Sequence, residues 1–415
     1  MQERRKKVAI LTLGCRVNQS ESSVIEGTLR EHGISIVSLE EAPDYCIVNT
    51  CTVTGKSDAS SRYLIRRAVR TRAEVIVTGC YSQLEERELF ENLGVHEVFP
   101  TGDKEKIIKR VLGYNADPIY FLHDRARPYL KVQDGCNFSC TYCAVPLARG
   151  RSRSLPLDEA VARASDMALQ GYHEIVLTGI HLGGYGQDLF PKTSLSQLIR
   201  TILLKTSLYR IRLSSIEINE ISDELIELLG DPRVCRHLHL PLQSGSDLIL
   251  RLMNRNYTAR TYQKKLLRLA AISSDIALGT DVIAGFPTEG DKEFKSTYTM
   301  IKELPFSYVH TFPYSARIGT VAADLKPQIP SNLTYDRVET VKELSRAKQE
   351  AFASAHADKT LDAIAEGEDA SGYTTGTTSN YLKVDVQGSS IKRGSVVFVR
   401  TTAVQGDRLR GVMIS

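Results

Sequence analysis

Residues 129–143 read YLKVQDGCNFSCTYC, a short apolar run followed closely by three cysteines. The run predicts a buried strand, and similar runs recur along the middle of the chain with amphipathic helical patterns between most of them. The predicted strands are 129–133, 174–178, 211–215, 236–240, 277–283 and 308–312. Six β/α units predict a partial or complete parallel barrel over residues 121–350, in a chain of the α/β class.

The segment before this barrel has the pattern of an open parallel sheet. In residues 1–120, the β-branched runs at 8–13, 45–49 and 74–78 alternate with helical patterns. Such runs are typical of strands that are buried on both faces. We therefore predict a doubly wound α/β domain at the N-terminus.

The segment after the barrel changes character. A long helical pattern covers residues 335–357, and from residue 372 the pattern becomes one of short alternating runs separated by Gly and Ser, such as 381–386 and 396–399. These features predict a small β-barrel in the third domain, residues 351–415.

Composition excludes several classes of protein. No apolar run approaches the ~20 residues of a membrane helix, and the basic start does not lead into a signal peptide, so we expect a cytoplasmic protein with no membrane partner. Eight cysteines in that compartment indicate metal binding, catalysis or burial, not disulfides. The net charge of +4 means that a nucleic-acid site must be a local patch. We expect a monomer.

Cys136, Cys140 and Cys143 form the tightest cysteine group. Three thiolates at this spacing can bind three irons of a 4Fe-4S cubane and leave the fourth iron without a protein ligand. Zinc is the competing interpretation, but zinc normally takes four ligands and no second pair lies nearby in sequence. The group follows the first strand of the predicted barrel, at the end where barrel enzymes place their chemistry.

Cys15, Cys51 and Cys80 are far apart in sequence, yet each comes just past the end of an apolar strand of the N-terminal domain. The carboxyl ends of parallel strands meet at one crevice, so these thiols are predicted to form a second cluster site. The alternative is three independent core cysteines, which is how we interpret Cys46. Cys235 receives no role.

The CxxxCxxC spacing resembles the radical S-adenosylmethionine (radical SAM) superfamily, and further motifs resemble the methylthiotransferase family within it. The order of its domains is also similar: a cluster domain, a radical SAM domain and a small β-barrel of TRAM type. The segments that carry the resemblance are 13–18, 49–54, 78–80, 148–153, 239–246, 253–258 and 281–288.

This resemblance implies two 4Fe-4S clusters and S-adenosylmethionine as cofactors. The cluster at Cys136, Cys140 and Cys143 would generate a 5′-deoxyadenosyl radical, and the auxiliary cluster at Cys15, Cys51 and Cys80 would supply or carry sulfur. A second S-adenosylmethionine would give the methyl group. A radical route suits the C2–H bond of an adenine ring, which offers no acid–base handle, while the protein positions the cofactor.

Within the family, residues 49–54 and 178–186 resemble the branch that adds a methylthio group to C2 of N6-threonylcarbamoyladenosine at position 37 of tRNA. Two other branches stay open: one acts on isopentenyladenosine in tRNA, and one acts on a ribosomal-protein aspartate. The latter tends to have Pro and Lys after its first cysteine, where this chain has Arg16 and Val17. An alternative of another class is a non-catalytic metal- and RNA-binding protein.

Loop residues near the predicted strand ends are candidates for binding the cofactor. Glu217, Gln243 and Arg255 could hold its amino or ribose groups, although polar loop residues often only satisfy the backbone. His181 is as easily explained by a solvated position as by a functional one.

Basic stretches predict contact with RNA phosphate, with solvated surface charge as the alternative. Arg62, Arg66 and Arg70 follow helical spacing and would form one stripe. Three further arginines come just after the radical SAM motif, and the C-terminal barrel is rich in basic residues. These additional candidates are Arg149, Arg151, Arg153, Lys383, Lys392, Arg393, Arg408 and Arg410. The implied partners are tRNA and a reductant protein.

Overall fold

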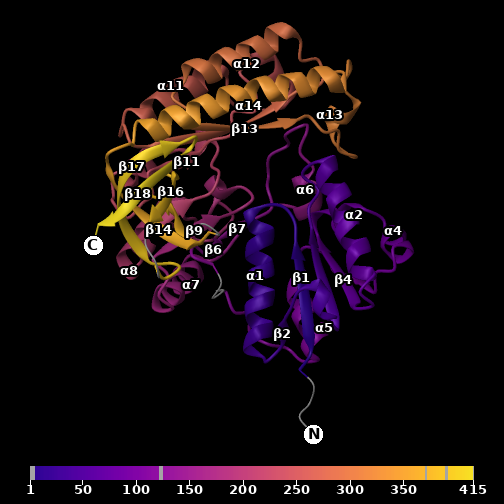
Figure 1. Ribbon diagram of the computed structural model, residues 1–415. Helices are drawn as coiled ribbons and strands as arrows, with labels where there is room; N and C mark the ends of the chain where they lie inside the picture. Colours follow the sequence, from indigo (N-terminus) through magenta and orange to yellow (C-terminus); the bar gives the residue numbers. More distant parts are fainter. Residues whose placement is uncertain (1–4, 121–124, 370–371, 388–390, 415) are drawn as a thin grey trace.

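The computed structural model describes residues 5–120, 125–369, 372–387 and 391–414. The fold is a mixture of helices and mostly parallel sheets, as predicted. In Figure 1 an N-terminal α/β unit lies beside a larger sheet covered by helices, and the yellow C-terminal strands form a third unit against the larger sheet. None of the helices in these ranges is long and apolar enough to cross a bilayer.

The N-terminal unit is one parallel sheet with helices on both faces. Its strand order is β2-β1-β3-β4-β5. Neighbouring strand residues point to opposite cores: Ala9 packs with Ile65 of α2, whereas Val8 packs with Leu29 of α1 and Ile107 of α5. The predicted doubly wound sheet is confirmed. The strands are β1 Lys7–Thr12, β2 Ser35–Ile36, β3 Tyr45–Thr50, β4 Glu74–Gly79 and β5 Glu97–Val98, and the helices are α1 Arg16–Glu31, α2 Gly55–Val69, α3 Cys80–Leu84, α4 Arg87–Asn92 and α5 Lys104–Leu112.

The central unit is a partial barrel of six parallel strands. Two three-stranded sheets, β6-β9-β10 and β11-β12-β13, meet where Ile211 pairs with Val234 and where the Ile216 amide donates to the His239 carbonyl at 3.0 Å. Each of the six predicted strands is present. They are β6 Tyr129–Lys131, β9 Glu174–Thr178, β10 Arg210–Leu213, β11 His237–His239, β12 Ala277–Ala284 and β13 Tyr308–Pro313, and a small ribbon pairs β7 Gln133–Asp134 with β8 Arg153–Ser154.

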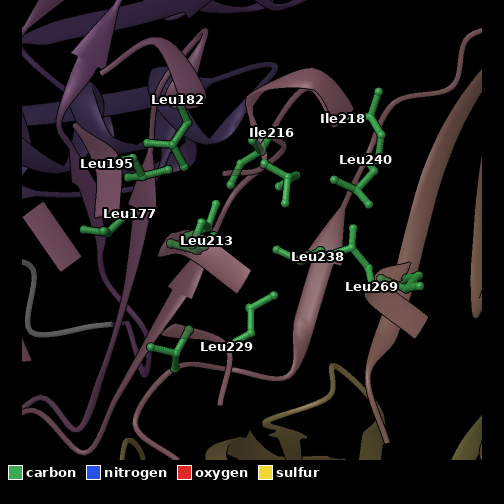
Figure 2. Packing of buried hydrophobic residues seen from close by; sticks show 14 of the residues in the cluster. Leu177, Leu182, Leu195, Leu213, Ile216, Ile218, Leu229, Leu238, Leu240 and Leu269 are labelled. Carbon is green, nitrogen blue, oxygen red and sulfur yellow. The ribbon is translucent and has the colours of Figure 1, made fainter. Parts of the chain in front are cut away.

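Helices cover the outside of this barrel because their apolar residues recur at helical spacing. In α8 the buried residues Leu195, Leu198 and Ile202 lie on one face, and the Ser194 side chain caps the helix by accepting from the Gln197 amide at 3.1 Å. Figure 2 shows the resulting core between strands and helices. The helices are α6 Val145–Arg149, α7 Leu157–Leu169, α8 Leu195–Lys205, α9 Asp223–Leu228, α10 Asp247–Leu252, α11 Ala259–Ala270, α12 Asp291–Glu303 and α13 Val321–Asp324.

The C-terminal unit is a closed barrel with the strand order β14-β15-β16-β18-β17. It follows α14 (Ser331–Ser354), which packs against β13 and begins four residues before the predicted start. The sequence pattern suggested strands from residue 372, whereas β14 already begins at Thr360; its buried residues Ala363, Ile364 and Ala365 are consecutive, so it lacks the alternating apolar pattern of a half-buried strand. The strands are β14 Thr360–Glu368, β15 Tyr373–Thr378, β16 Lys383–Gln387, β17 Val396–Gln405 and β18 Arg408–Ile414.

A buried ionic group joins the C-terminal barrel to the central one. Glu174 of β9 lies between Arg210 and Arg212 of β10, and all three side chains are fully buried. Arg210 also donates to the Thr377 carbonyl at 2.8 Å and Arg212 to the Thr378 carbonyl at 2.8 Å. Burial alone would raise the pKa of Glu174, but Arg212 and Arg210 outweigh it and hold the pKa well below its usual value.

We expect Glu174→Gln to lower the free energy of unfolding by about 3 kcal/mol, because the buried Arg212 loses its carboxylate partner and Arg210 keeps only Asp362. Urea denaturation followed by circular dichroism measures it. Glu227→Gln is the matched control: that carboxylate pairs with Arg200 at 2.9 Å but its side chain is 72% exposed. The control should cost less than about 1 kcal/mol.

The same variant makes a prediction about pH. Because the pKa of Glu174 is lowered in the folded state, its stabilisation is complete above the unfolded-state pKa of about 4.3 and is lost as the pH falls below it. The difference in stability between the wild type and Glu174→Gln should therefore be constant near neutral pH and shrink in acid. A difference that grew in acid would contradict the assignment.

Candidate active site

Cys136, Cys140 and Cys143 lie on the loop that follows β7, and all three are free thiols and partly buried. The Cys136 amide donates to the Gly150 carbonyl at 3.0 Å, and the Cys143 amide donates to the Cys140 carbonyl at 3.0 Å. Burial raises the pKa of the Cys143 thiol to about 12. These backbone hydrogen bonds order the loop that carries the three thiols. The loop lies at the carboxyl end of the barrel strands, as predicted.

The segment after α10 forms hydrogen bonds with this loop. The Thr141 amide donates to the Met253 carbonyl at 3.1 Å, and Asn254 Nδ2 donates to the Ser139 carbonyl at 2.9 Å. Asn254 adopts the left-handed backbone conformation, φ 56°, which asparagine tolerates better than most residues. The motif at 253–258 thus stabilises the cysteine loop by hydrogen bonds.

Two predicted cofactor-binding residues lie beside the loop. Arg255 Nη1 donates to Cys140 Sγ at 3.3 Å, and Arg255 Nη2 forms an ion pair with Glu217. Burial raises the pKa of Glu217, while the pairing with Arg255 opposes that effect. The pair places one positive and one negative group next to the thiols.

The third predicted residue, Gln243, lines a cavity of about 210 Å³ together with Cys143 and Asp281. Gln243 has φ 64° and forms a bridge with Val282, so the turn after β11 directs the chain back towards β12. All three predicted cofactor-binding residues therefore lie near the cysteine loop; their contacts with a cofactor stay a prediction.

His181 belongs to the same surroundings, although sequence reasoning left its role undecided. Its side chain is only 11% exposed, it hydrogen-bonds to Glu220, and its ring packs on Phe138 at a centroid distance of 4.3 Å. Burial opposes protonation, but hydrogen bonds to Cys136 and Glu220 outweigh it and raise the pKa of His181 to about 10. In the sequence, the position of His181 just past the end of a predicted strand was the feature that could have indicated a place in this site.

Cys15, Cys51 and Cys80 follow β1, β3 and β4, which are neighbours in the N-terminal sheet. A Cβ on Gly14 would lie 2.6 Å from Cys51 Sγ, so only glycine lets the first two strand ends approach this closely. Burial raises the pKa of Cys51, and the Cys15 and Cys80 thiols add to that increase. The structure therefore brings these three residues to one edge. Cys46 is buried in an apolar core, as predicted, and Cys235 is buried near the charged side chains Arg212 and Glu174.

The two cysteine groups open onto adjacent cavities. Cys15 and Cys51 line a cavity of about 990 Å³ between the N-terminal sheet and β13. The smaller cavity at Cys143 shares several wall residues with it, among them Val53, Thr54 and residues 312–315. A substrate between the N-terminal unit and the central barrel can therefore reach both groups.

Neither cysteine group has its three thiols as close together as a single zinc ion would require. A tetrahedral zinc with Zn–S bonds of about 2.3 Å would draw its sulfur ligands to within about 4 Å of each other. In the described part of the chain, the one set of three such ligand atoms within 4.8 Å is His239, Asp281 and His310, which includes no cysteine. That set is explained by an ion pair, because His239 Nε2 and Asp281 Oδ1 are 2.9 Å apart.

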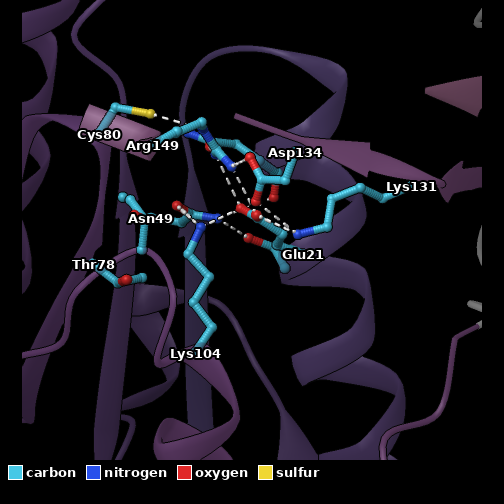
Figure 3. Close-up of polar contacts among 12 residues, drawn as sticks. Glu21, Asn49, Thr78, Cys80, Lys104, Lys131, Asp134 and Arg149 are labelled. Atoms are coloured by element: carbon cyan, nitrogen blue, oxygen red, sulfur yellow. Dashed lines mark hydrogen bonds and ion pairs between the residues drawn. The ribbon is translucent and has the colours of Figure 1, made fainter. Parts of the chain in front are cut away.

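The prediction for Arg149 was wrong. It was predicted to contact RNA at the mouth of the site, but its side chain is fully buried, so no phosphate can reach it. Its Nε donates to Cys80 Sγ at 3.1 Å, and its Nη1 donates to Glu21 and Asp134 at 2.9 Å each (Figure 3). The helix α6 turns this arginine inwards, whereas sequence spacing alone suggested a surface position.

Arg149 is the centre of a buried ionic network between the two units. Lys104 of the N-terminal unit and Lys131 of β6 both pair with Glu21, and Lys131 also reaches Asp134 at 3.2 Å. Asp134 stands two residues before Cys136. The network thus connects Cys80 with the start of the cysteine loop at Cys136.

The other predicted RNA-binding residues include side chains held by neighbours and side chains that are exposed; among the latter, Arg153 also donates to the Arg149 carbonyl at 3.2 Å. Arg62 donates to the Tyr81 hydroxyl at 3.0 Å, and two residues of the C-terminal barrel form ion pairs, Lys383 with Glu366 and Arg408 with Asp385. The exposed ones are Arg66, Arg70, Arg151, Arg153, Lys392, Arg393 and Arg410.

Two family descriptions match separate parts of the chain. Residues 7–100 match an uncharacterized protein family, UPF0004, and residues 130–301 match the Radical SAM superfamily. The first range includes Cys15, Cys51 and Cys80, and the second includes Cys136, Cys140 and Cys143. The two matches therefore divide the cysteines into the same two groups as the structure does.

Similar proteins cover nearly the whole chain. Threonylcarbamoyladenosine tRNA methylthiotransferase MtaB of Bacillus subtilis (strain 168) is 38% identical over 95% of this chain and 93% of that protein. The protein of the same name from Aquifex aeolicus (strain VF5) is 36% identical over 92% and 97%. The solved radical S-adenosylmethionine methyltransferase TsrM from Kitasatospora setae has a similar fold, with a TM-score of 0.57 over 77% of each chain at 15% identity.

We expect Arg149→Met to lower the midpoint of thermal unfolding by about 5 °C, because Glu21 and Asp134 lose a buried countercharge and keep only their lysine partners. Differential scanning fluorimetry measures the midpoint. Arg151→Met is the control, since Arg151 lies two residues away and is exposed; its midpoint should stay within about 1 °C of the wild type. Equal shifts in both variants would contradict the role of the network.

Proposed function

The chain belongs to the methylthiotransferase family of radical SAM enzymes, and we propose that it adds a methylthio group to C2 of N6-threonylcarbamoyladenosine at position 37 of tRNA. The observation that carries this proposal is the pair of cysteine groups on adjacent cavities. The identity of the chain to relatives named for that nucleoside supports the choice of substrate.

In this proposal Cys136, Cys140 and Cys143 would hold a 4Fe-4S cluster, next to which S-adenosylmethionine would bind. Such a cluster supplies the electron that cleaves the sulfonium bond of this cofactor. Arg255 donates to Cys140 and neutralises part of the negative charge that ligation leaves on its sulfur. Glu217 and Gln243, at the same end of the barrel, have the oxygen acceptors that a cofactor amino or hydroxyl group requires.

Cys15, Cys51 and Cys80 bind the auxiliary 4Fe-4S cluster, which supplies or carries the sulfur. Arg149 stabilises the Cys80 thiolate, because it lowers the pKa that burial raises. Cys15 is exposed and lines the larger cavity, so sulfur held here faces the space shared with the radical SAM group.

The RNA would contact the exposed basic residues. Arg66 and Arg70 lie on α2, Arg151 and Arg153 follow the radical SAM loop, and Lys392, Arg393 and Arg410 belong to the C-terminal barrel. The proposal assigns residues 1–120 to the auxiliary cluster, 121–350 to radical chemistry and 351–415 to RNA binding. It also includes a cytoplasmic, monomeric enzyme and a separate reductant protein.

The deciding experiment is nucleoside analysis of tRNA from a strain in which the gene is deleted. Mass spectrometry should show that N6-threonylcarbamoyladenosine loses its 2-methylthio group, and that the chain restores it on a plasmid. If that nucleoside stayed methylthiolated while 2-methylthio-isopentenyladenosine or a modified ribosomal protein disappeared, the substrate assignment would be wrong.

Iron and sulfide analysis separates the enzyme from a non-catalytic metal-binding protein. The anaerobically purified chain should contain about eight iron and eight sulfide ions, as two cubanes require. Zinc without sulfide would rule out the proposed chemistry.

Single cysteine variants should divide the reaction into two parts. We expect Cys140→Ala to abolish cleavage of S-adenosylmethionine, and Cys51→Ala to retain cleavage but insert no sulfur, because each removes a ligand of a different cluster. Chromatography of 5′-deoxyadenosine and of the modified nucleoside measures both. Cys46→Ala is the control, since this buried thiol lies in the apolar core. Sulfur insertion by Cys51→Ala would remove the auxiliary cluster from the mechanism.

A further inference from the structure

The residue after Cys15 directs its side chain away from the cysteine group. Arg16 begins α1, and its Nη2 donates to the hydroxyl of Tyr381, in the turn between β15 and β16, at 3.2 Å. The residue is half-buried, and no carboxylate among the described residues lies within 4.0 Å of it. A partly desolvated arginine held by a neutral hydroxyl has donors left for an anion.

Arg16 lines a cavity of about 170 Å³ where all three units meet. The ionisable wall is mainly basic, with Glu366 as its carboxylate. Arg127 and Arg212 are already neutralised, the former by Glu366 and Glu174 and the latter by Glu174. Arg16, Arg125 and Arg393 have no such partner in the described ranges, so the cavity carries excess positive charge. The basic wall residues are Arg16, Arg125, Arg127, Arg212 and Arg393.

Polar rings lie between this cavity and the smaller cavity at Cys143. Tyr381 stacks on His237 at a centroid distance of 4.3 Å, and the Tyr308 hydroxyl lies 2.8 Å from His237 Nε2 and 3.0 Å from His239 Nδ1. His239 in turn pairs with Asp281, which lines the cavity at Cys143. A row of buried polar rings therefore separates the two cavities.

We propose that Arg16 and the basic cavity around it bind the carboxylate of the substrate base's N6-threonylcarbamoyl group. This inference rests on the proposed function and assigns a residue to its choice of nucleoside. A threonylcarbamoyl group presents a carboxylate, a hydroxyl and amide groups, which match a basic, polar interior. An isopentenyl group has only carbon atoms and would leave Arg16 and these rings without partners, which a site built for polar groups strongly disfavours.

The test uses three anticodon stem-loop RNAs of one sequence, with N6-threonylcarbamoyladenosine, its methyl ester, or unmodified adenosine at position 37. Fluorescence anisotropy at one salt concentration measures their binding to the anaerobic holoenzyme. The wild type should bind the carboxylate RNA about tenfold more tightly than the other two, the value of one charged hydrogen bond. The ester neutralises the carboxylate and adds one methyl group but keeps the hydroxyl and amide groups, so this comparison needs no protein variant.

The variants then locate the binding group. Arg16→Met should lose the preference for the carboxylate RNA over the ester RNA, with its iron content checked because Cys15 is adjacent. Tyr381→Phe should lose part of the preference, since the hydroxyl that positions Arg16 is gone. Arg87→Met is the control: this arginine pairs with Glu91 on α4, is 78% exposed, and should keep the full preference.

Two results would overturn the inference. If Arg16→Met weakened all three RNAs by the same factor, Arg16 would contact a backbone phosphate and not the base. If the preference survived in Arg16→Met, the carboxylate would bind elsewhere. The proposed function is tested separately, by whether the wild type methylthiolates the carboxylate RNA; that reaction can succeed while the role of Arg16 fails.

Discussion

The arrangement of the site depends on one buried guanidinium. Arg149 belongs to the barrel, yet its partners Glu21 and Cys80 belong to the N-terminal unit, and Asp134 precedes the radical SAM loop. A charge with no exposure must be neutralised where it stands, since leaving it unpaired costs several kcal/mol. This requirement holds the two units in one relative position, and the two cysteine groups therefore face adjacent cavities.

A second buried charge has a similar effect at the other side of the barrel. Glu174 pairs with Arg210 and Arg212, and the spare donors of both arginines bind carbonyl oxygens of the C-terminal barrel. Barrel interiors are commonly filled by branched apolar residues. Here several inner positions are charged or aromatic, so buried polar rings, and not branched apolar side chains, lie between Arg16 and Asp281.

Sequence patterns predicted most strands and both cysteine groups, but they failed where the contacts come from distant segments. The carboxyl ends of parallel strands meet at one edge, so Cys15, Cys51 and Cys80 could be brought together from local context alone. Arg149 looked like its exposed neighbour Arg151, because the carboxylates that bury it lie 128 and 15 residues away. His181 was undecided for the same reason, and β14 was missed because its apolar residues do not alternate with polar ones.

By itself the sequence determined the order of the three units, the family and the six thiols available to bind iron, since all of these follow from residue type and local spacing. Only the tertiary structure decided which side chains share a cavity: Arg149 with Cys80, Arg255 with Cys140, and Arg16 with Tyr381, 365 residues away. The physical reason is that burial and pairing are properties of the packed chain. A charge is exposed or neutralised according to what lies against it, and the local pattern of residues contains no record of that partner.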